Sequence, residues 1–178
     1  MKFGFLICGP SGTGKSSHVT EMLKNANITQ KFLLIDPDKL EGIHSEQSKK
    51  ALELVYEQIE KNKNFVYIAT CGGMKIIQTI LKKMKEKKMR SIVAIPYIKL
   101  STALERVKKR TEQIVSEEVI KDLHSFFNTK AERYMKLNNL DEIYLYNNET
   151  DFNLLYSKIK DKITCTSGEF FFDISKYC

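Results

Sequence analysis

The segment Gly9–Ser16 has the residue pattern of a loop that binds phosphate groups. Its sequence, G-P-S-G-T-G-K-S, fits the Walker A pattern G-x-x-x-x-G-K-[ST] at every fixed position. The glycines let backbone N–H groups turn toward an anion, Lys15 would reach the β- and γ-phosphates, and the Ser16 hydroxyl would ligate Mg²⁺. The pattern predicts a nucleotide site formed by Gly9, Pro10, Ser11, Gly12, Thr13, Gly14, Lys15, Ser16 and Ser17.

Two acids follow the second apolar run of the chain, in the segment Ile35-Asp36-Pro37-Asp38. An acid at this place can act as a general base toward a substrate hydroxyl, or it can position hydrated Mg²⁺. The same carboxylates can instead cap the next helix or form the Asp-Pro turn. The residues alone leave both interpretations of Asp36 and Asp38 open.

Arg106 and Arg110 are four residues apart, so the helix expected over residues 100–111 carries both on one face. Near a transferred phosphoryl group they would stabilise the charge that grows in the transition state, although the segment also fits a solvated basic face. The third β-rich run ends at Ala69-Thr70. Many phosphate-loop enzymes have an acid there that holds Mg²⁺ through water, and its loss favours a binding module over an enzyme.

Strands and helices alternate along the chain. β-rich runs are expected at 3–8, 31–35, 64–70, 91–96 and 142–146, and helices at 15–26, 44–61, 73–88, 100–111, 116–138 and 151–163. Continuous apolar runs such as Phe5-Leu6-Ile7 are typical of parallel strands buried on both faces. Right-handed crossovers then predict an α/β fold, a three-layer α/β/α sandwich with the loop and the acids at the carboxyl edge of its sheet.

Length and charge set the class of protein and of partner. A chain of 178 residues suits one domain with a core of its own. The formal net charge of +7 favours anionic partners such as nucleotides or nucleic acid, although the lysine-rich run 82–88 is also typical of a solvated helix face. No apolar stretch is long enough to cross a bilayer, so no membrane partner is expected.

The four cysteines, Cys8, Cys71, Cys165 and Cys178, form no C-x-x-C pair. We expect reduced thiols and a cytoplasmic protein. Residues 1–163 are expected to form the nucleotide-binding domain and residues 164–178 a C-terminal extension. Three consecutive phenylalanines, 170–172, are unlikely to remain in water, so we expect the extension to dock on the domain, with a dimer contact as the alternative.

The order of these motifs resembles that of the zeta-toxin-type phosphate-loop kinases over roughly residues 3–148. The resemblance rests on the Walker A loop, on Ile35-Asp36-Pro37-Asp38, on the arginine-bearing segment 104–110, and on segment 114–120 followed by 141–148. It implies ATP-dependent phosphorylation of a hydroxyl, a five-stranded parallel sheet in the order 2-3-1-4-5, and a lid at about residues 110–118. It also indicates Asp38 as the general base.

The main hypothesis is an ATP-dependent kinase that transfers the γ-phosphoryl group of Mg-ATP to a hydroxyl of a small molecule or of a nucleic-acid end. In it, Lys15 holds the phosphates, Asp38 is the base, Arg106 and Arg110 stabilise the moving phosphoryl group, and Ser16 with Asp36 holds the metal. Ala69 and Gln113 depart from the family, which has an acid and a lid arginine there. The alternative is a nucleotide-binding module with degenerate catalytic apparatus.

Overall fold

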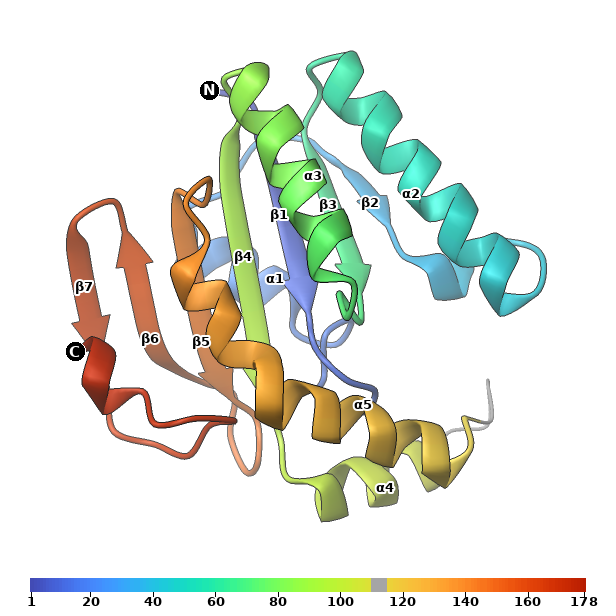
Figure 1. Cartoon of the computed structure of the whole chain (residues 1–178), viewed down its shortest axis with the longest axis vertical. Helices are drawn as coiled ribbons and strands as arrows, with labels where there is room; N and C mark the ends of the chain where they lie inside the picture. The colour runs from blue at the N-terminus through green and yellow to red at the C-terminus, as the bar shows by residue number, and fades with distance from the viewer. Residues whose placement is uncertain (110–114) are drawn as a thin grey trace.

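The computed structural model describes residues 1–109 and 115–178, which form a twisted β-sheet with helices on both faces (Figure 1). The strands are β1 (Phe3–Cys8), β2 (Leu33–Ile35), β3 (Phe65–Ala69), β4 (Arg90–Tyr97), β5 (Glu142–Asn147), β6 (Asn153–Ile159) and β7 (Lys162–Cys165). The α-helices are α1 (Val19–Asn25), α2 (His44–Glu60), α3 (Met74–Glu86), α4 (Leu100–Lys108) and α5 (Glu117–Lys130). The 3₁₀ helices are η1 (Pro37–Lys39), η2 (Ala131–Lys136) and η3 (Ser175–Tyr177).

The fold is α/β, as expected, but its sheet has more strands than predicted. Strands β1 to β5 are parallel in the order β2-β3-β1-β4-β5, and β6 and β7 continue the sheet antiparallel beyond β5. The prediction of a five-stranded, wholly parallel sheet is therefore wrong. Within the described residues the sheet has seven strands and is mixed.

The helix expected over residues 151–163 is also wrong, because this segment forms the hairpin of β6 and β7. Pairing β6 with β5 covers an edge of the sheet that would otherwise expose unpaired N–H and C=O groups. It also buries Tyr156 opposite Leu145. The connection is Lys160-Asp161, with Lys160 at φ +55°, so the turn has none of the glycines or asparagines that usually mark a hairpin in a sequence.

Side chains of β1 alternate between the two layers of the core. Phe3, Phe5 and Ile7 pack on the side of α1, whereas Leu6 and Cys8 belong to the cluster on the other face. That second cluster takes residues from α2, α3, α5 and the C-terminal tail, which cover the face nearest the viewer in Figure 1. Burial on both faces explains why β1 is a continuous apolar run, and the Walker A loop leaves its carboxyl end.

The cysteines are paired, so the expectation of reduced thiols is wrong for this structure. Cys8 is bonded to Cys71 and Cys165 to Cys178, which leaves no free cysteine. The wrong prediction relied on sequence spacing, and both pairs join residues that only the fold brings together. Cys165 and Cys178 fasten the end of β7 to the last residue of the chain.

The C-terminal tail packs against the sheet through its aromatic residues. Phe170 and Phe171 are buried, with ring centroids 5.8 and 4.8 Å from the ring of Tyr97 at the end of β4. The Tyr97 hydroxyl donates to Glu169, and burial together with this carboxylate raises the pKa of Tyr97 to about 12. Among the described residues, no helix is both long and apolar enough to cross a membrane.

Candidate active site

The Walker A loop is a tight turn whose glycines are required by its backbone and by its neighbours. Gly12 and Gly14 both have φ +86°, a left-handed conformation that favours glycine. A Cβ atom on Gly14 would lie 2.3 Å from Nδ2 of Asn148, which follows β5. The regular α1 helix begins only at Val19, because residues 15–18 form a turn, so the loop and not a long helix holds the nucleotide-site residues.

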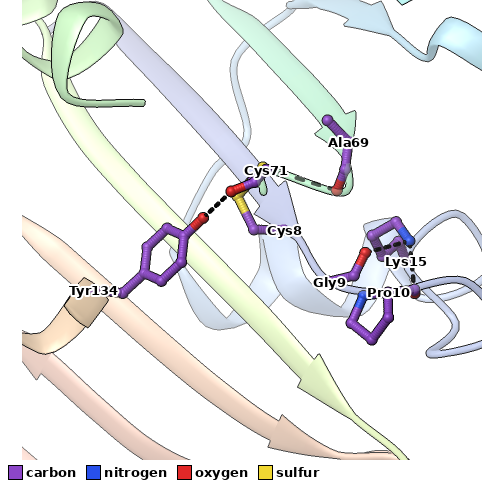
Figure 2. Close-up of a disulfide and its surroundings, with 7 residues drawn as sticks. All are labelled: Cys8, Gly9, Pro10, Lys15, Ala69, Cys71 and Tyr134. Atoms are coloured by element: carbon purple, nitrogen blue, oxygen red, sulfur yellow. Dashed lines mark hydrogen bonds between the residues drawn. A yellow bond between two sulfur atoms is a disulfide. The ribbon is translucent and has the colours of Figure 1, made fainter. Parts of the chain in front are cut away.

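Lys15 lies folded back over its own loop. Its Nζ donates to the carbonyl oxygens of Gly9 and Pro10, at 2.8 Å each (Figure 2). Thr13 is buried and donates from Oγ1 to the same Pro10 oxygen at 3.0 Å. The ammonium group therefore lies against the backbone of the loop that the Walker A pattern predicts to contact phosphate.

Ser16 and Asp36, the two residues predicted to hold a metal, meet in the structure. The Ser16 hydroxyl donates to Oδ2 of Asp36 across 3.3 Å, from two segments 20 residues apart. Asp36 is also the N-cap of η1, where its Oδ1 accepts from the backbone N–H of Asp38 at 3.2 Å. Both interpretations drawn from the sequence thus apply to Asp36, because one oxygen caps η1 and the other reaches the loop.

A cavity of about 880 Å³ opens beside these residues. Asp36, buried, and Asp38, exposed on η1, both line it. The loop contributes Ser11, Gly12, Gly14, Lys15 and Ser16, whereas Gly9, Pro10, Thr13 and Ser17 are not part of the lining. The opposite wall comes from the start of α2, from the segment after β3 and from α5. The phosphate-loop residues and the two acids therefore border one cavity.

The described part of the predicted lid borders the same cavity. The lid was expected at residues 110–118, and Arg110 and Gln113 lie outside the described residues, so the structure says nothing of them. Val115 and Ser116 line the cavity, and the Ser116 hydroxyl accepts from the Val119 N–H to cap α5.

Arg106 takes a different place from the one expected. Its Nη2 donates to the carbonyl oxygen of Asn148 at 2.8 Å and is 3.5 Å from that of Glu149, and the side chain does not line the cavity. Burial raises the pKa of Glu149, but the hydrogen bonds from Thr102 and the Lys99 N–H, together with the charges of Lys99 and Arg106, lower it overall. The guanidinium therefore joins α4 to the end of β5, and its contact with a phosphoryl group stays a prediction.

The chemistry of the donors at Ser16 and Asp36 suits a hard cation. Mg²⁺ prefers oxygen ligands and usually takes only one or two from the protein, with the rest from phosphates and water. A hydroxyl and a carboxylate oxygen 3.3 Å apart beside the phosphate loop fit this requirement. Among residues 1–109 and 115–178, no cluster of three or more His, Cys, Asp or Glu side chains forms a metal site without phosphate.

Comparisons with known proteins give a match in structure and none in sequence. No protein family and no curated protein matches the chain. It superposes on the AvrRxo1-ORF1:AvrRxo1-ORF2 complex with a TM-score of 0.72 at 14% identity, over 93% of this chain and 61% of that chain. It superposes on a structure of the PezAT toxin–antitoxin system of Streptococcus pneumoniae with a TM-score of 0.69 at 15% identity, over 88% and 72%.

A third match is the Pnkp1/Rnl/Hen1 RNA repair complex, with a TM-score of 0.58 at 14% identity, over 74% of this chain and 46% of that chain. The chain has a zeta-toxin-type phosphate-loop kinase fold. The resemblance stated from the motifs is thereby confirmed at the level of the fold. The kinase-fold chain spans about 61% of the length of the AvrRxo1 chain, one structure of which was solved with ATP.

Two residues that the sequence analysis did not place in the site, Asn148 and His124, support the phosphate loop of this kinase fold. Asn148 donates from Nδ2 to the carbonyl oxygen of Thr13 at 3.0 Å, and both residues are buried. His124 of α5 is buried beside the backbone of Ser11 and near Lys15, and burial lowers its pKa. The pair Asn147-Asn148 at the end of a strand was a visible signal, whereas a single histidine on a helix was not.

Proposed function

We propose that the protein is an ATP-dependent phosphotransferase, which transfers the γ-phosphoryl group of Mg-ATP to an alcohol group. One observation carries the proposal: Lys15 and Ser16 of the phosphate loop share a cavity with Asp36 and Asp38. The cavity of about 880 Å³ has room for an acceptor next to a triphosphate on the loop. A site that only stored a nucleotide would need Asp36 for the metal and would have no need of Asp38 in the same cavity.

Four of the polar residues that line the cavity, Lys15, Ser16, Asp36 and Asp38, each have a task in this reaction. The loop amides and Lys15 hold the β- and γ-phosphates, so Lys15 exchanges the carbonyls of Gly9 and Pro10 for phosphate oxygens. Ser16 and Asp36 would hold Mg²⁺, which when bound neutralises negative charge on the phosphates. Asp38 accepts the proton of the acceptor hydroxyl as that oxygen attacks phosphorus, and Arg106 with Arg110 stabilises the transferred group once the site closes.

Substitution of the acids tests this assignment. Asp38→Asn is expected to leave Mg-ATP affinity nearly intact and to lower turnover by ~10²–10⁴-fold, because the amide cannot accept the proton. Asp36→Asn is expected to lower the affinity for Mg²⁺ as well, since Asp36 contacts Ser16 and the two would hold the ion together. The measurement is ADP release with panels of sugar alcohols, nucleosides and 5′-hydroxyl oligonucleotides. Full turnover by Asp38→Asn would show that the base is another group.

The acceptor is proposed as a small-molecule hydroxyl or a nucleic-acid end. The net charge of +7 favours the second, and one similar fold belongs to an RNA repair complex. Activity on oligonucleotides that falls steeply with salt, together with salt-insensitive activity on nucleosides, would identify the nucleic-acid acceptor.

A nucleotide-binding module without phosphotransferase activity is the second candidate. Ala69 lines the cavity where an acid is absent, and Arg106 is engaged with Asn148 and not directed into the cavity. Tight Mg-ATP binding with no ADP formed on any acceptor would support this candidate. For either form we propose residues 1–163 as the nucleotide-binding domain and residues 164–178, which begin within β7, as its extension.

A further inference from the structure

The Cys8–Cys71 disulfide joins the two chain segments that meet under the phosphate loop. Cys8 is the last residue of β1, and Gly9 of the loop follows it directly. Cys71 lies two residues beyond β3, and the Cα atoms of the pair are 5.2 Å apart across a sequence separation of 63. Figure 2 shows the bond beside Gly9, whose carbonyl oxygen accepts from Lys15. Any change in this bond therefore acts one residue from the loop.

The two sulfur atoms differ in how a reagent can reach them. Cys8 is fully buried, whereas Cys71 lines the cavity of the candidate site and retains 6% of its exposure. A thiolate that enters the cavity therefore approaches the bond from the side of Cys71. Thiol–disulfide exchange needs such access together with a leaving sulfur on the other side, which Cys8 supplies.

The surroundings of Cys71 accommodate the reduced form too. Its Sγ lies 3.7 Å from the carbonyl oxygen of Ala69, which can accept from a thiol, and Cys8 would remain as a small buried side chain (Figure 2). The Tyr134 hydroxyl donates to the Cys71 carbonyl oxygen at 2.5 Å, so the backbone keeps one anchor without the disulfide. After reduction, the Cys71 thiol and the Cys71 carbonyl oxygen therefore each keep a partner.

We propose that Cys8–Cys71 is a reversible thiol–disulfide site that couples the order of the phosphate loop to the thiols around the protein. A thiolate of a small dithiol attacks Cys71 Sγ, the Sγ–Sγ bond breaks, and Cys8 leaves as a thiolate that takes up a proton. The second thiol of the reagent then displaces Cys71. The protein gains two electrons and two protons, and the dithiol becomes a disulfide.

Reduction is expected to increase the backbone freedom of the segment after β3, while the rest of the fold stays ordered. Cys71 has φ +54°, a left-handed conformation, and Gly72-Gly73 follow it, so this segment gains backbone freedom when the bond is cut. The loop keeps the Asn148–Thr13 and Thr13–Pro10 hydrogen bonds. We expect a folded protein in which the loop and residues 70–73 are less ordered.

The second disulfide provides a matched control. Cys165 and Cys178 are exposed and lie in β7 and the C-terminal tail, away from the residues that line the cavity. The double variant Cys165→Ser/Cys178→Ser keeps only the inner bond, and Cys8→Ala/Cys71→Ala keeps only the outer one. Comparing the two assigns any response to one disulfide.

The first measurement needs no nucleotide. Dithiothreitol is added to Cys165→Ser/Cys178→Ser, the free thiols are alkylated and located by mass spectrometry, and amide hydrogen exchange is followed. Two results together support the proposal. Cys8 and Cys71 are alkylated while the protein remains cooperatively folded. Amide exchange at residues 9–16 and 70–73 becomes faster by several-fold, and reoxidation reverses this change. Unchanged exchange after reduction, or alkylation only in unfolded protein, overturns it. Cys8→Ala/Cys71→Ala should show fast exchange in these segments whether or not dithiothreitol is present.

The second measurement extends the proposal to nucleotide binding and rests on the proposed function. Oxidised Cys165→Ser/Cys178→Ser is expected to bind Mg-ATP about 10-fold more tightly than its reduced form, because binding the reduced loop must also order it. Equal affinity in both forms overturns the link to nucleotide binding. If exchange responds to dithiothreitol while neither form binds Mg-ATP, the proposed function fails and the thiol–disulfide site stands.

Discussion

The side chain of Asn148 holds the phosphate loop from a distance of 135 residues. The side-chain Nδ2 of Asn148 donates to the Thr13 carbonyl oxygen at 3.0 Å, and the backbone carbonyl oxygen of Asn148 accepts from Arg106 at 2.8 Å. Its backbone N–H donates to the carbonyl oxygen of Tyr97 at the end of β4. One residue thus ties α4, β4 and β5 to the loop, which orders the loop amides before a ligand arrives.

Asn148→Ala is expected to lower both the stability and the affinity for Mg-ATP. The substitution leaves the buried Thr13 carbonyl without its donor, which costs about 1–3 kcal/mol of unfolding free energy. Urea denaturation measures the first effect and titration calorimetry the second. Asn138→Ala, at an exposed position, is the control and should change neither quantity. A wild-type denaturation midpoint for Asn148→Ala would contradict the support that we assign to this side chain.

Gly14→Ala is expected to disturb the same contact from the other side. The added Cβ would lie 2.3 Å from Asn148 Nδ2 on a residue with φ +86°, so clash and backbone strain add. We expect a loss of about 2 kcal/mol or more in unfolding free energy, measured by denaturation. Gly72→Ala is the matched control, since its Cβ would meet only the Phe126 ring, at 3.9 Å or more. If both variants lost the same stability, the contact with Asn148 would not be the cause.

The sequence predicted those parts of the site that are contiguous in the chain. The Walker A loop, β1 and the Asp36-Pro37-Asp38 turn are local, so residue type and spacing determine them. Their neighbours were not predictable in this way. The contacts of Asn148 with Thr13 and of Cys8 with Cys71 depend on how strands far apart in the chain line up in the sheet.

The errors at the sheet edge have a related cause. Residues 151–163, for which a helix was predicted, have enough apolar residues at mixed spacing to fit one, and the Lys160-Asp161 turn has no hairpin signal. The open edge of β5 decides the outcome, and that edge exists only after the parallel strands have assembled. The two additional strands therefore depend on pairing with β5, which the spacing of apolar residues in the sequence does not reveal.

The ion pair between Arg90 and Glu142 is expected to matter more than the surface pairs. Arg90 Nε and Nη2 donate to the two carboxylate oxygens at 2.5 and 2.6 Å, Tyr144 donates to Glu142 as well, and Glu142 is buried. Glu142→Gln should cost about 2 kcal/mol of unfolding free energy, because it leaves the partly buried Arg90 guanidinium without its counter-charge. Glu105→Gln, which breaks the exposed pair with Lys109, should cost under about 0.5 kcal/mol. Equal effects in urea denaturation would contradict this ranking.

His124 is expected to make the stability depend on pH on the acid side of neutrality. Burial, opposed by the Ser11 backbone and aided by the charge of Lys15, lowers its pKa below the ordinary 6.5. The unfolded chain therefore binds a proton at this ring where the folded chain does not. The free energy of unfolding falls as the pH drops from about 6.5 toward the lowered value, by at most about 1.4 kcal/mol per pH unit.

Urea denaturation of His124→Gln at pH 7.5 and 5.5 checks this sign, since an amide does not titrate. The variant should lose less stability than the wild type between the two values. His44→Gln removes an exposed histidine and should keep the wild-type difference. Because other groups titrate in all three proteins, the comparison between variants and not the absolute slope carries the test. A difference for His124→Gln equal to that of the wild type would mean that the ring takes up its proton over the same pH range in the folded and the unfolded chain, so that burial of Nε2, which has no hydrogen-bond partner among the described residues, does not keep the ring neutral.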